Sequence, residues 1–481
     1  MLSCRAPIPA TVRRVHLMGV AGSAMAALGG MLAERGFRVT GSDSQFFEPA
    51  ASMLRRAGIQ IGVDFSPDNL APPPDLVVVG NVITRANPEA QALLASNIPY
   101  VSMPEAIAHF FLPGSRTLMV AGTHGKTTST AMIAHVLKAA GRDPSMLVGG
   151  VARNLESNYY LGTGTDFVIE GDEYDTAFFD KGPKFLHYGP QATIVTALEF
   201  DHADIYRDLA QVKSAFAALS AQMDAGRLAV LCADYPAVLD VFAETRARRL
   251  TFGLDAGEFR AGEIRIGPDG ARFVVTRDGQ PVSRLLRLQI GGRMNVANAL
   301  GAYVLLREIG LSDEEIEPGL VTFAGVKRRQ ELIGEAGGIA VIDDFAHHPT
   351  AIRATLEAVA ERYPGRPILA AFEPRSNTAR RNVFQAQFAA AFDRATHVYI
   401  GAVYFKENDP IAPEQRLDVG ELARAISLRG PRAHAFGSTD KLLAAMLADC
   451  PADAVAVVMS NGAFDGLPRR ILAELKQRSG T

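Results

Sequence analysis

Short apolar runs alternate with helical patterns along most of the chain. Short, mostly apolar runs occur at 15–18, 76–79 and 117–121, and a glycine-containing turn follows each run. Ala- and Leu-rich stretches of helical length come after the first and third of these turns, at 24–35 and 129–140, and each ends at a glycine. This alternation is typical of α/β proteins, in which helices pack on a mostly parallel sheet.

The strand–turn–helix pattern falls into three blocks and predicts three domains. We expect an N-terminal Rossmann-like domain at 1–113, a central P-loop domain at 114–323 and a C-terminal Rossmann-like domain at 324–481. In the third block the apolar runs predict another parallel, doubly wound sheet, with strands at 339–342, 368–371, 397–400 and 454–459. The predicted fold class is therefore α/β.

Composition narrows the functional class. The chain has 481 residues, 48% of them hydrophobic and 21% charged, with a formal net charge of −3. A near-neutral chain has no general attraction to nucleic acid or an anionic membrane, so we expect neither as a partner. We see no signal peptide and no apolar run long enough to span a membrane. Three widely spaced cysteines are typical of a reducing compartment, and we expect a cytoplasmic protein; oligomeric state is not predicted.

The first block contains a nucleotide-binding pattern. A strand, a glycine turn and a helix are followed about 20 positions later by an acidic residue, as in Rossmann domains. The turn reads GVAGSA, which departs from GxGxxG and argues against a nicotinamide dehydrogenase. The candidate contacts are Gly19, Val20, Ala21, Gly22, Ser23, Ala24, Asp43, Ser44 and Asn81.

The second block opens with a phosphate-binding pattern. A buried-strand run leads directly into Gly122, Thr123, His124, Gly125, Lys126, Thr127 and Thr128, and then into a helix. Backbone N–H groups of such a loop bind phosphate, while the lysine adds charge and the first threonine can ligate Mg²⁺. Val120 stands where the usual motif has glycine, so the loop is a variant. The alternatives are a glycine-rich turn with an incidental lysine, and a nucleotide-switched regulator without catalysis.

Two acidic segments follow later strands of this block. The first contains Glu170, Asp172, Glu173 and Asp175, and the second reads EFDHAD and contains His202. Clustered carboxylates repel one another unless cations neutralise them, and Mg²⁺ prefers oxygen ligands. The alternative is a solvated acidic loop.

The sequence GTHGKTT after a strand, preceded by a Rossmann-like block, resembles the Mur ligase family over essentially the whole chain. The resemblance implies an enzyme that uses ATP and Mg²⁺ to join a UDP-N-acetylmuramoyl carboxylate to an amine. It implies that the 19–24 turn binds the UDP-sugar. It also implies that Thr127 ligates one Mg²⁺ and that Glu170 and His202 ligate a second.

Further family positions lie in the C-terminal half. By resemblance, Asn298 contacts adenine with Asn295 nearby, although Met294 replaces the family's usual histidine. Arg329 matches an arginine that contacts the γ-phosphate, and Asp344 matches a ribose contact. Either His347 or His348 faces the reacting centre, so the expected catalytic residues are Lys126, His202, Arg329, His347 and His348. A helix cap at the asparagines and a solvated basic linker at 327–329 are the alternatives.

Two segments bear on the incoming amine. DEYDTAFFDK at 172–181 and FEPRSNT at 372–378 resemble family members that attach the preformed tripeptide L-alanyl-γ-D-glutamyl-meso-diaminopimelate in peptidoglycan recycling. Arg375 can hold a peptide carboxylate, and Ser376 and Asn377 can hydrogen-bond peptide groups. The alternatives are an L-alanine-adding ligase of the same family and a plain strand-end turn at EPRSN.

The implied reaction has two steps. The muramoyl carboxylate attacks the γ-phosphate of ATP and forms an acyl phosphate, and the amine then displaces phosphate. Closure of the domains would keep water from the acyl phosphate.

Overall fold

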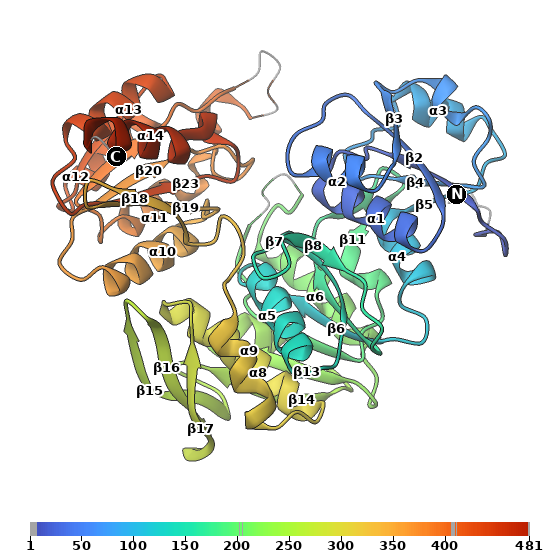
Figure 1. The fold of residues 1–481 in the computed structure, drawn as a ribbon, viewed down its shortest axis with the longest axis horizontal. Coiled ribbons are helices and arrows are strands. Elements are labelled where there is room, and N and C mark those ends of the chain that lie inside the picture. Colours follow the sequence, from blue (N-terminus) through green and yellow to red (C-terminus); the bar gives the residue numbers. More distant parts are fainter. Residues whose placement is uncertain (1–6, 202, 204, 406–408, 410, 480–481) are drawn as a thin grey trace. The chain divides into compact units, whose positions relative to one another are not determined.

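The computed structural model describes residues 7–201, 203, 205–405, 409 and 411–479 (Figure 1). Two compact units make up the chain. The first unit contains Met1–Leu198, Ala210–Phe252 and Gly301–Gly319, and the second contains Glu199–Leu209, Gly253–Leu300 and Leu320–Thr481. The predicted α/β class is confirmed in both units.

The N-terminal sheet of the first unit is fully parallel. Its order is β3-β2-β1-β4-β5, so the strand order reverses between β1 and β4. Ligands of open parallel sheets bind at such a switch point, beyond the carboxyl ends of the strands. The elements are β1 (Arg14–Met18), α1 (Ser23–Glu34), β2 (Arg38–Asp43), α2 (Ala50–Arg56), β3 (Gln60–Val63), β4 (Leu76–Val79), α3 (Pro88–Leu94), β5 (Tyr100–Ser102) and α4 (Met103–Phe110).

The second sheet of this unit runs in the order β14-β13-β12-β6-β9-β7-β8. All of these pairs whose register is described are parallel, except the β7–β8 hairpin. A small hairpin, β10–β11, follows β9. The strands are β6 (Arg116–Ala121), β7 (Ser145–Ala152), β8 (Ser157–Tyr160), β9 (Asp166–Gly171), β10 (Asp175–Ala177), β11 (Asp180–Pro183), β12 (Ala192–Val195), β13 (Leu228–Cys232) and β14 (Arg248–Gly253).

Strand order in this sheet decides which loops meet. Strand β6 lies between β9 and β12, with Val120 opposite Glu170 and Ala121 opposite Val195. The carboxyl ends of all three strands therefore reach the same edge of the sheet.

The helices are α5 (Lys126–Ala139), α6 (Leu209–Gln222), α7 (Pro236–Val241), α8 (Arg293–Glu308) and α9 (Asp313–Thr322).

The second unit contains an antiparallel meander that the sequence patterns did not predict. It consists of β15 (Phe259–Gly267), β16 (Gly270–Arg277) and β17 (Gln280–Leu288). Along β17 most side chains are exposed, whereas Leu286 and Leu288 are buried. Such a strand lacks the continuous apolar run that marks the buried strands elsewhere.

The C-terminal sheet has the order β18-β19-β23-β20-β21-β22. It is parallel as predicted, except for β18, which pairs antiparallel with β19 at one edge. Its elements are β18 (Glu331–Ala336), β19 (Ile339–Asp344), α10 (Pro349–Arg362), β20 (Ile368–Phe372), α11 (Gln385–Ala391), β21 (His397–Ile400), α12 (Val419–Ser427), β22 (Arg432–Ala435), α13 (Thr439–Ala448), β23 (Val455–Met459) and α14 (Leu467–Ser479).

Helices cover both faces of this C-terminal sheet (Figure 1). Along β19, Ala340 and Ile342 pack in a core with α10–α12, whereas Val341 packs in a second core with α13 and α14. Successive side chains of a strand point to opposite faces, so a doubly covered strand is apolar throughout. Among the described residues, none of the helices is long and apolar enough to cross a membrane.

Candidate functional site

The phosphate-binding pattern forms a tight loop between β6 and α5. Gly122 and Gly125 adopt left-handed backbone conformations, with φ of 130° and 79°. A side chain at Gly122 would collide with the Thr196 hydroxyl, which also donates hydrogen bonds to the carbonyls of Ala121 and His124. Helix α5 begins at Lys126, three residues before the predicted start, because Gly125 supplies the turn. Lys126 and Thr127 consequently lie in the first helical turn, where N–H groups are available to an anion.

Lys126 lies within a group of carboxylates. Its ammonium donates to the Gly122 carbonyl at 2.8 Å and to both oxygens of Glu173, at 2.7 and 3.0 Å. Asp172 is 4.0 Å away. Burial alone would lower the pKa of Lys126, but the nearby charges of Glu173, Asp172 and Glu170 outweigh burial and raise it. The lysine is therefore fully charged and buried.

Glu170, the penultimate residue of β9, lies beside the same helix start. Its carboxylate accepts from the Thr127 hydroxyl at 3.0 Å and from the Gly149 N–H at 2.7 Å. Burial raises the pKa of Glu170, Lys126 lowers it and Asp172 raises it again. Thr127 and Glu170, both expected as metal ligands, are thus brought together. His202, the third expected ligand, lies outside the described residues.

The expected UDP-sugar turn lies at the switch point of the N-terminal sheet. The N–H groups of Gly19 and Val20 donate to the Ser42 carbonyl at 2.9 and 3.1 Å. Asp43 accepts from the Ala21 N–H at 2.9 Å and from the Ser44 N–H at 2.8 Å. Its carboxylate therefore shapes the turn itself, a role that the sequence pattern did not reveal.

The rest of the turn leads into helix α1. Gly22 caps the helix, and Ser23 and Ala24 begin it. The buried amide of Asn158 donates to the Ser23 carbonyl and to its hydroxyl, each at 3.1 Å. Asn81, two residues after the end of β4, is exposed at the same edge of the sheet.

In the second unit, Asp344 ends β19 and is almost fully buried. It accepts from the N–H groups of Gln330 and Ala346, each at 2.7 Å. Burial raises the pKa of Asp344, and the charge of Arg329 opposes that shift. The Arg329 guanidinium lies 4.9 Å from the centre of the Phe345 ring. Arg329 and Asp344, which are expected to contact different parts of ATP, are therefore neighbours.

Arg328 and Asp343 stand beside this pair. Arg328 donates to the carbonyls of Ser460 and Gly462, each at 2.6 Å, and lies 3.3 Å from Asp343. Burial raises the pKa of Asp343 to about 6, against the lowering effect of Arg328. Arg328 thus connects the loop before β18 to the loop after β23 and has a structural role.

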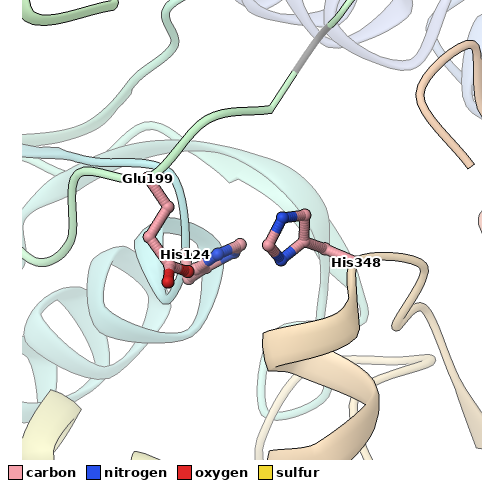
Figure 2. Close-up of side chains that lie close together, drawn as sticks. All are labelled: His124, Glu199 and His348. Atoms are coloured by element: carbon pink, nitrogen blue, oxygen red, sulfur yellow. The ribbon is translucent and has the colours of Figure 1, made fainter. Parts of the chain in front are cut away.

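The two histidines differ in their surroundings. His348 is buried and caps α10, where its Nδ1 accepts from the Thr350 N–H at 3.3 Å. Thr350 also donates to Glu199 at 3.3 Å, and Figure 2 shows Glu199 with His348, both in the second unit. His347 is only half-buried, and its Nδ1 lies 3.0 Å from the Phe345 carbonyl. Glu199 was not among the predicted site residues; its place after a strand of the P-loop sheet was the available signal.

The two asparagines lie in the first turns of α8. The Asn295 side chain donates to the Gly291 carbonyl at 2.7 Å, and the Asn298 amide donates to Oδ1 of the Asn295 side chain at 3.4 Å. Both are buried. Met294, which replaces the family histidine, accepts a weak hydrogen bond from Gln330 at 3.5 Å.

The expected peptide contacts follow β20. Arg375 is exposed and lies 3.6 Å from Glu373. The Ser376 hydroxyl accepts from the Ala379 N–H at 3.0 Å, and the Asn377 side chain accepts from Arg380 at 2.8 Å. A cavity of about 260 Å³ opens nearby, lined by Glu373, Ala402, Gly437, Ser438, Thr439, Asp440, Phe464 and Asp465.

Comparison with known proteins bears on this geometry. Three family descriptions match in chain order: "Mur ligase family, catalytic domain" at 14–113, "Mur ligase middle domain" at 120–306, and "Mur ligase, glutamate ligase domain" at 328–462. A UDP-N-acetylmuramate–L-alanyl-γ-D-glutamyl-meso-2,6-diaminoheptandioate ligase of Escherichia coli is 36% identical over 97% of this chain and 99% of its own. The chain belongs to the Mur ligase family. It is accordingly an ATP-dependent ligase that forms a C–N bond.

Solved Mur ligases also share the fold. A murein peptide ligase from Psychrobacter arcticus superimposes with a TM-score of 0.71 at 31% identity, covering 96% of this chain and 98% of its own. A UDP-N-acetylmuramate–alanine ligase from Thermotoga maritima has a TM-score of 0.79 at 26% identity, with coverage of 97% and 99%. The resemblance deduced from the motifs is therefore confirmed at the level of family and fold.

Proposed function

We propose that this Mur ligase joins L-alanyl-γ-D-glutamyl-meso-diaminopimelate to UDP-N-acetylmuramate in peptidoglycan recycling. The observation that carries the proposal is the convergence of Lys126, Thr127 and Glu170 at the adjoining ends of β6 and β9. The choice of acceptor is supported by two relatives of that name, which are 35–36% identical over 97% of this chain.

ATP binds with its phosphates at the start of α5. The loop from Gly122 to Thr128 supplies N–H groups, and Lys126 supplies charge at the β- and γ-phosphates. In the second unit, Asn295 and Asn298 are assigned to adenine, Asp344 to the ribose and Arg329 to the γ-phosphate. An arginine from a separate unit stabilises transferring charge only when the units close around the substrates.

The residues at Glu170 fit a magnesium ion. A threonine hydroxyl and a carboxylate meet at 3.0 Å, both are hard oxygen donors, and the carboxylate is buried where an uncompensated charge is costly. We assign Thr127 and Glu170, together with His202, as ligands. When bound, Mg²⁺ polarises the γ-phosphate and offsets its charge.

The UDP-sugar binds on the turn Gly19–Ala24, with Asp43, Ser44 and Asn81 beside it. The position beyond β1 and β4, at the switch point of a parallel sheet, supports this assignment. Asp43 acts by holding the Ala21 N–H and so fixing the turn that faces the diphosphate.

The reaction then proceeds in two steps. The lactyl carboxylate of the muramic acid attacks the γ-phosphorus, and the bond between this phosphorus and the β–γ bridging oxygen breaks. ADP departs and the muramoyl acyl phosphate is formed. Lys126 and Arg329 hold the charge that builds on the transferring group. The L-alanyl amine attacks the acyl carbon, loses a proton and expels phosphate. We assign His347 or His348 to the reacting centre, and closure excludes water.

The acceptor occupies the C-terminal unit. Arg375 would hold a peptide carboxylate, and Ser376 and Asn377 lie beside it. Three carboxylates line the adjoining cavity: Glu373, Asp440 and Asp465. A guanidinium next to carboxylates suits the zwitterionic end of diaminopimelate, whose ammonium and carboxylate sit on one carbon.

The proposed arrangement has three domains, at 1–113, 114–323 and 324–481, each delivering one reactant. The family matches at 14–113, 120–306 and 328–462 support these limits. We place the reaction in the cytoplasm, where ATP and UDP-sugars are made.

The competing function within the family is addition of free L-alanine, as in the Thermotoga maritima ligase. Purified protein is given ATP, Mg²⁺ and UDP-N-acetylmuramate with either the tripeptide or L-alanine, and products are identified by mass. We expect the tripeptide to be used with at least a hundredfold higher kcat/KM. Preference for L-alanine would reject the proposed acceptor and leave the family assignment intact.

A further inference from the structure

The Lys126 ammonium is already saturated with hydrogen-bond acceptors. An ammonium has three N–H donors. In this structure three acceptors surround it at 2.7–3.0 Å: the Gly122 carbonyl and both oxygens of Glu173. For Lys126 to donate to a phosphate, it has to give up one of these three acceptors, and two of the three are oxygens of Glu173. ATP and Glu173 therefore compete for the same ammonium.

Glu173 is held firmly in place. Its side chain is fully buried, at 0% exposure, and Lys126 is 10% exposed. Glu173 lies two residues before the β10–β11 hairpin. Within the hairpin, Thr176 donates to the Gly182 carbonyl at 2.8 Å and Lys181 pairs with Asp175 at 2.9 Å. At its base, Lys184 pairs with Asp172 at 2.8 Å. The carboxylate is thus presented by a small, cross-linked element.

The other end of the hairpin is anchored on the N-terminal sheet. Phe178 and Phe179 pack against the apolar cluster that includes Val79 and Ile83. The Phe179 ring lies edge-on to the Tyr100 ring, with 5.1 Å between the ring centres, and edge-on to the Phe178 ring at 5.0 Å. The Arg85 guanidinium lies 5.8 Å from the centre of the Phe178 ring. The hairpin therefore spans from the segment after β4, beside the proposed UDP-sugar turn, to the lysine of the phosphate loop.

We propose that Glu173 is a positioning residue that holds Lys126 back from the nucleotide site and releases it when ATP binds. The inference rests on the proposed ATP site. Glu173 keeps the buried ammonium paired while the site is empty, and the anchored hairpin sets how tightly it does so. Because Glu173 supplies two of the three acceptors with which a phosphate competes, it lowers ATP affinity in the absence of the other substrates.

The test measures ATP affinity by calorimetry, with Mg²⁺ and without UDP-sugar or peptide, so that there is no turnover. Glu173→Gln keeps the shape but removes the charge that competes for Lys126. We expect it to bind ATP roughly 5- to 30-fold more tightly than wild type, the scale of a lost charge-assisted contact. A damaged fold would weaken binding instead, so the direction separates a positioning role from a structural one.

Asp175→Asn is the matched control. It removes the same charge from the same hairpin, at a side chain that pairs with Lys181 rather than Lys126. It should change ATP affinity by less than about twofold, the effect of a screened surface charge. In a Lys126→Ala background, Glu173→Gln should likewise produce no more change than this control.

Phe179→Ala gives an independent variant in case the Gln variant does not fold. Loosening the anchor should tighten ATP binding in the same direction, by roughly two- to threefold. Unchanged or weaker affinity in folded Glu173→Gln or Phe179→Ala protein overturns the inference. So does an equal gain in the Lys126→Ala background. If wild type itself binds no ATP, the proposed function falls instead.

Discussion

The buried pair of Lys126 and Glu173 permits a quantitative prediction for Lys126→Met. Methionine fills a similar volume without charge, so the change leaves Glu173 buried, with Asp172 and Glu170 close by. Breaking a buried ion pair from one side costs about 3–5 kcal/mol, because the remaining charge has lost its partner. For a unit of roughly 250 residues, each kcal/mol shifts the melting temperature by about 2–4 °C. We therefore expect Lys126→Met to lower the nucleotide-free melting temperature by roughly 6–20 °C.

The double variant Lys126→Met/Glu173→Gln separates stability from chemistry. Removing both charges takes away the uncompensated carboxylate, so most of the lost melting temperature should return. Ligase activity should stay at least a thousandfold below wild type in both variants, because the phosphate loop has lost its own cation at the β- and γ-phosphates. Scanning calorimetry and product formation are measured on the same preparations. If the single variant melts within 2 °C of wild type, or if the double variant is no more stable than the single one, the reasoning about the pair is refuted.

Three further predictions follow from the same structure. Glu170→Gln should keep the stability of the nucleotide-free protein, because burial already disfavours the charged form of this carboxylate. Its ligase activity should fall at least a hundredfold and require a higher Mg²⁺ concentration, which a Mg²⁺ titration of the activity checks. Gly122→Ala should abolish ATP binding measured by calorimetry, because a backbone φ of 130° is strained for alanine and its methyl group would collide with the Thr196 side chain. If this variant bound ATP with wild-type affinity, the loop geometry would be wrong. The pKa of Asp343 is raised from 3.8 to about 6, so the folded state binds the proton of this carboxyl more tightly than the unfolded state does, and the free energy of unfolding of the wild type should fall by roughly 2–3 kcal/mol as pH rises from about 4 to about 6. Asp343→Asn should flatten this pH dependence in melting curves.

Much of the fold was readable from the sequence because its central strands are buried on both faces. Such strands form continuous apolar runs, and the runs at 76–79 and 397–400 match β4 and β21 residue for residue. The β15–β17 meander was missed because its strands mix exposed and buried positions. The edge strand β18 was not predicted either, because its side chains are mostly only partly buried.

The candidate site was readable only in part. The phosphate loop is contiguous, so its residues could be named from the sequence, and so could the acids that follow β9. Pairing Lys126 with Glu173 could not be predicted, because it depends on β9 lying beside β6 in a register that places Val120 opposite Glu170. Strand order is a tertiary property that local patterns do not specify. The role of Asp43 in shaping its own turn likewise emerges only when β1 and β2 are aligned.

The most direct measurement of the central claim is positional isotope exchange in ATP labelled with ¹⁸O at the β–γ bridge. With UDP-N-acetylmuramate present and no acceptor, reversible transfer of the γ-phosphoryl to the muramoyl carboxylate should move the label into non-bridging β positions. Scrambling should disappear when the sugar is omitted or when Lys126 is replaced by methionine. Unscrambled ATP in a preparation that makes product once the acceptor is added would contradict an acyl phosphate formed at this lysine.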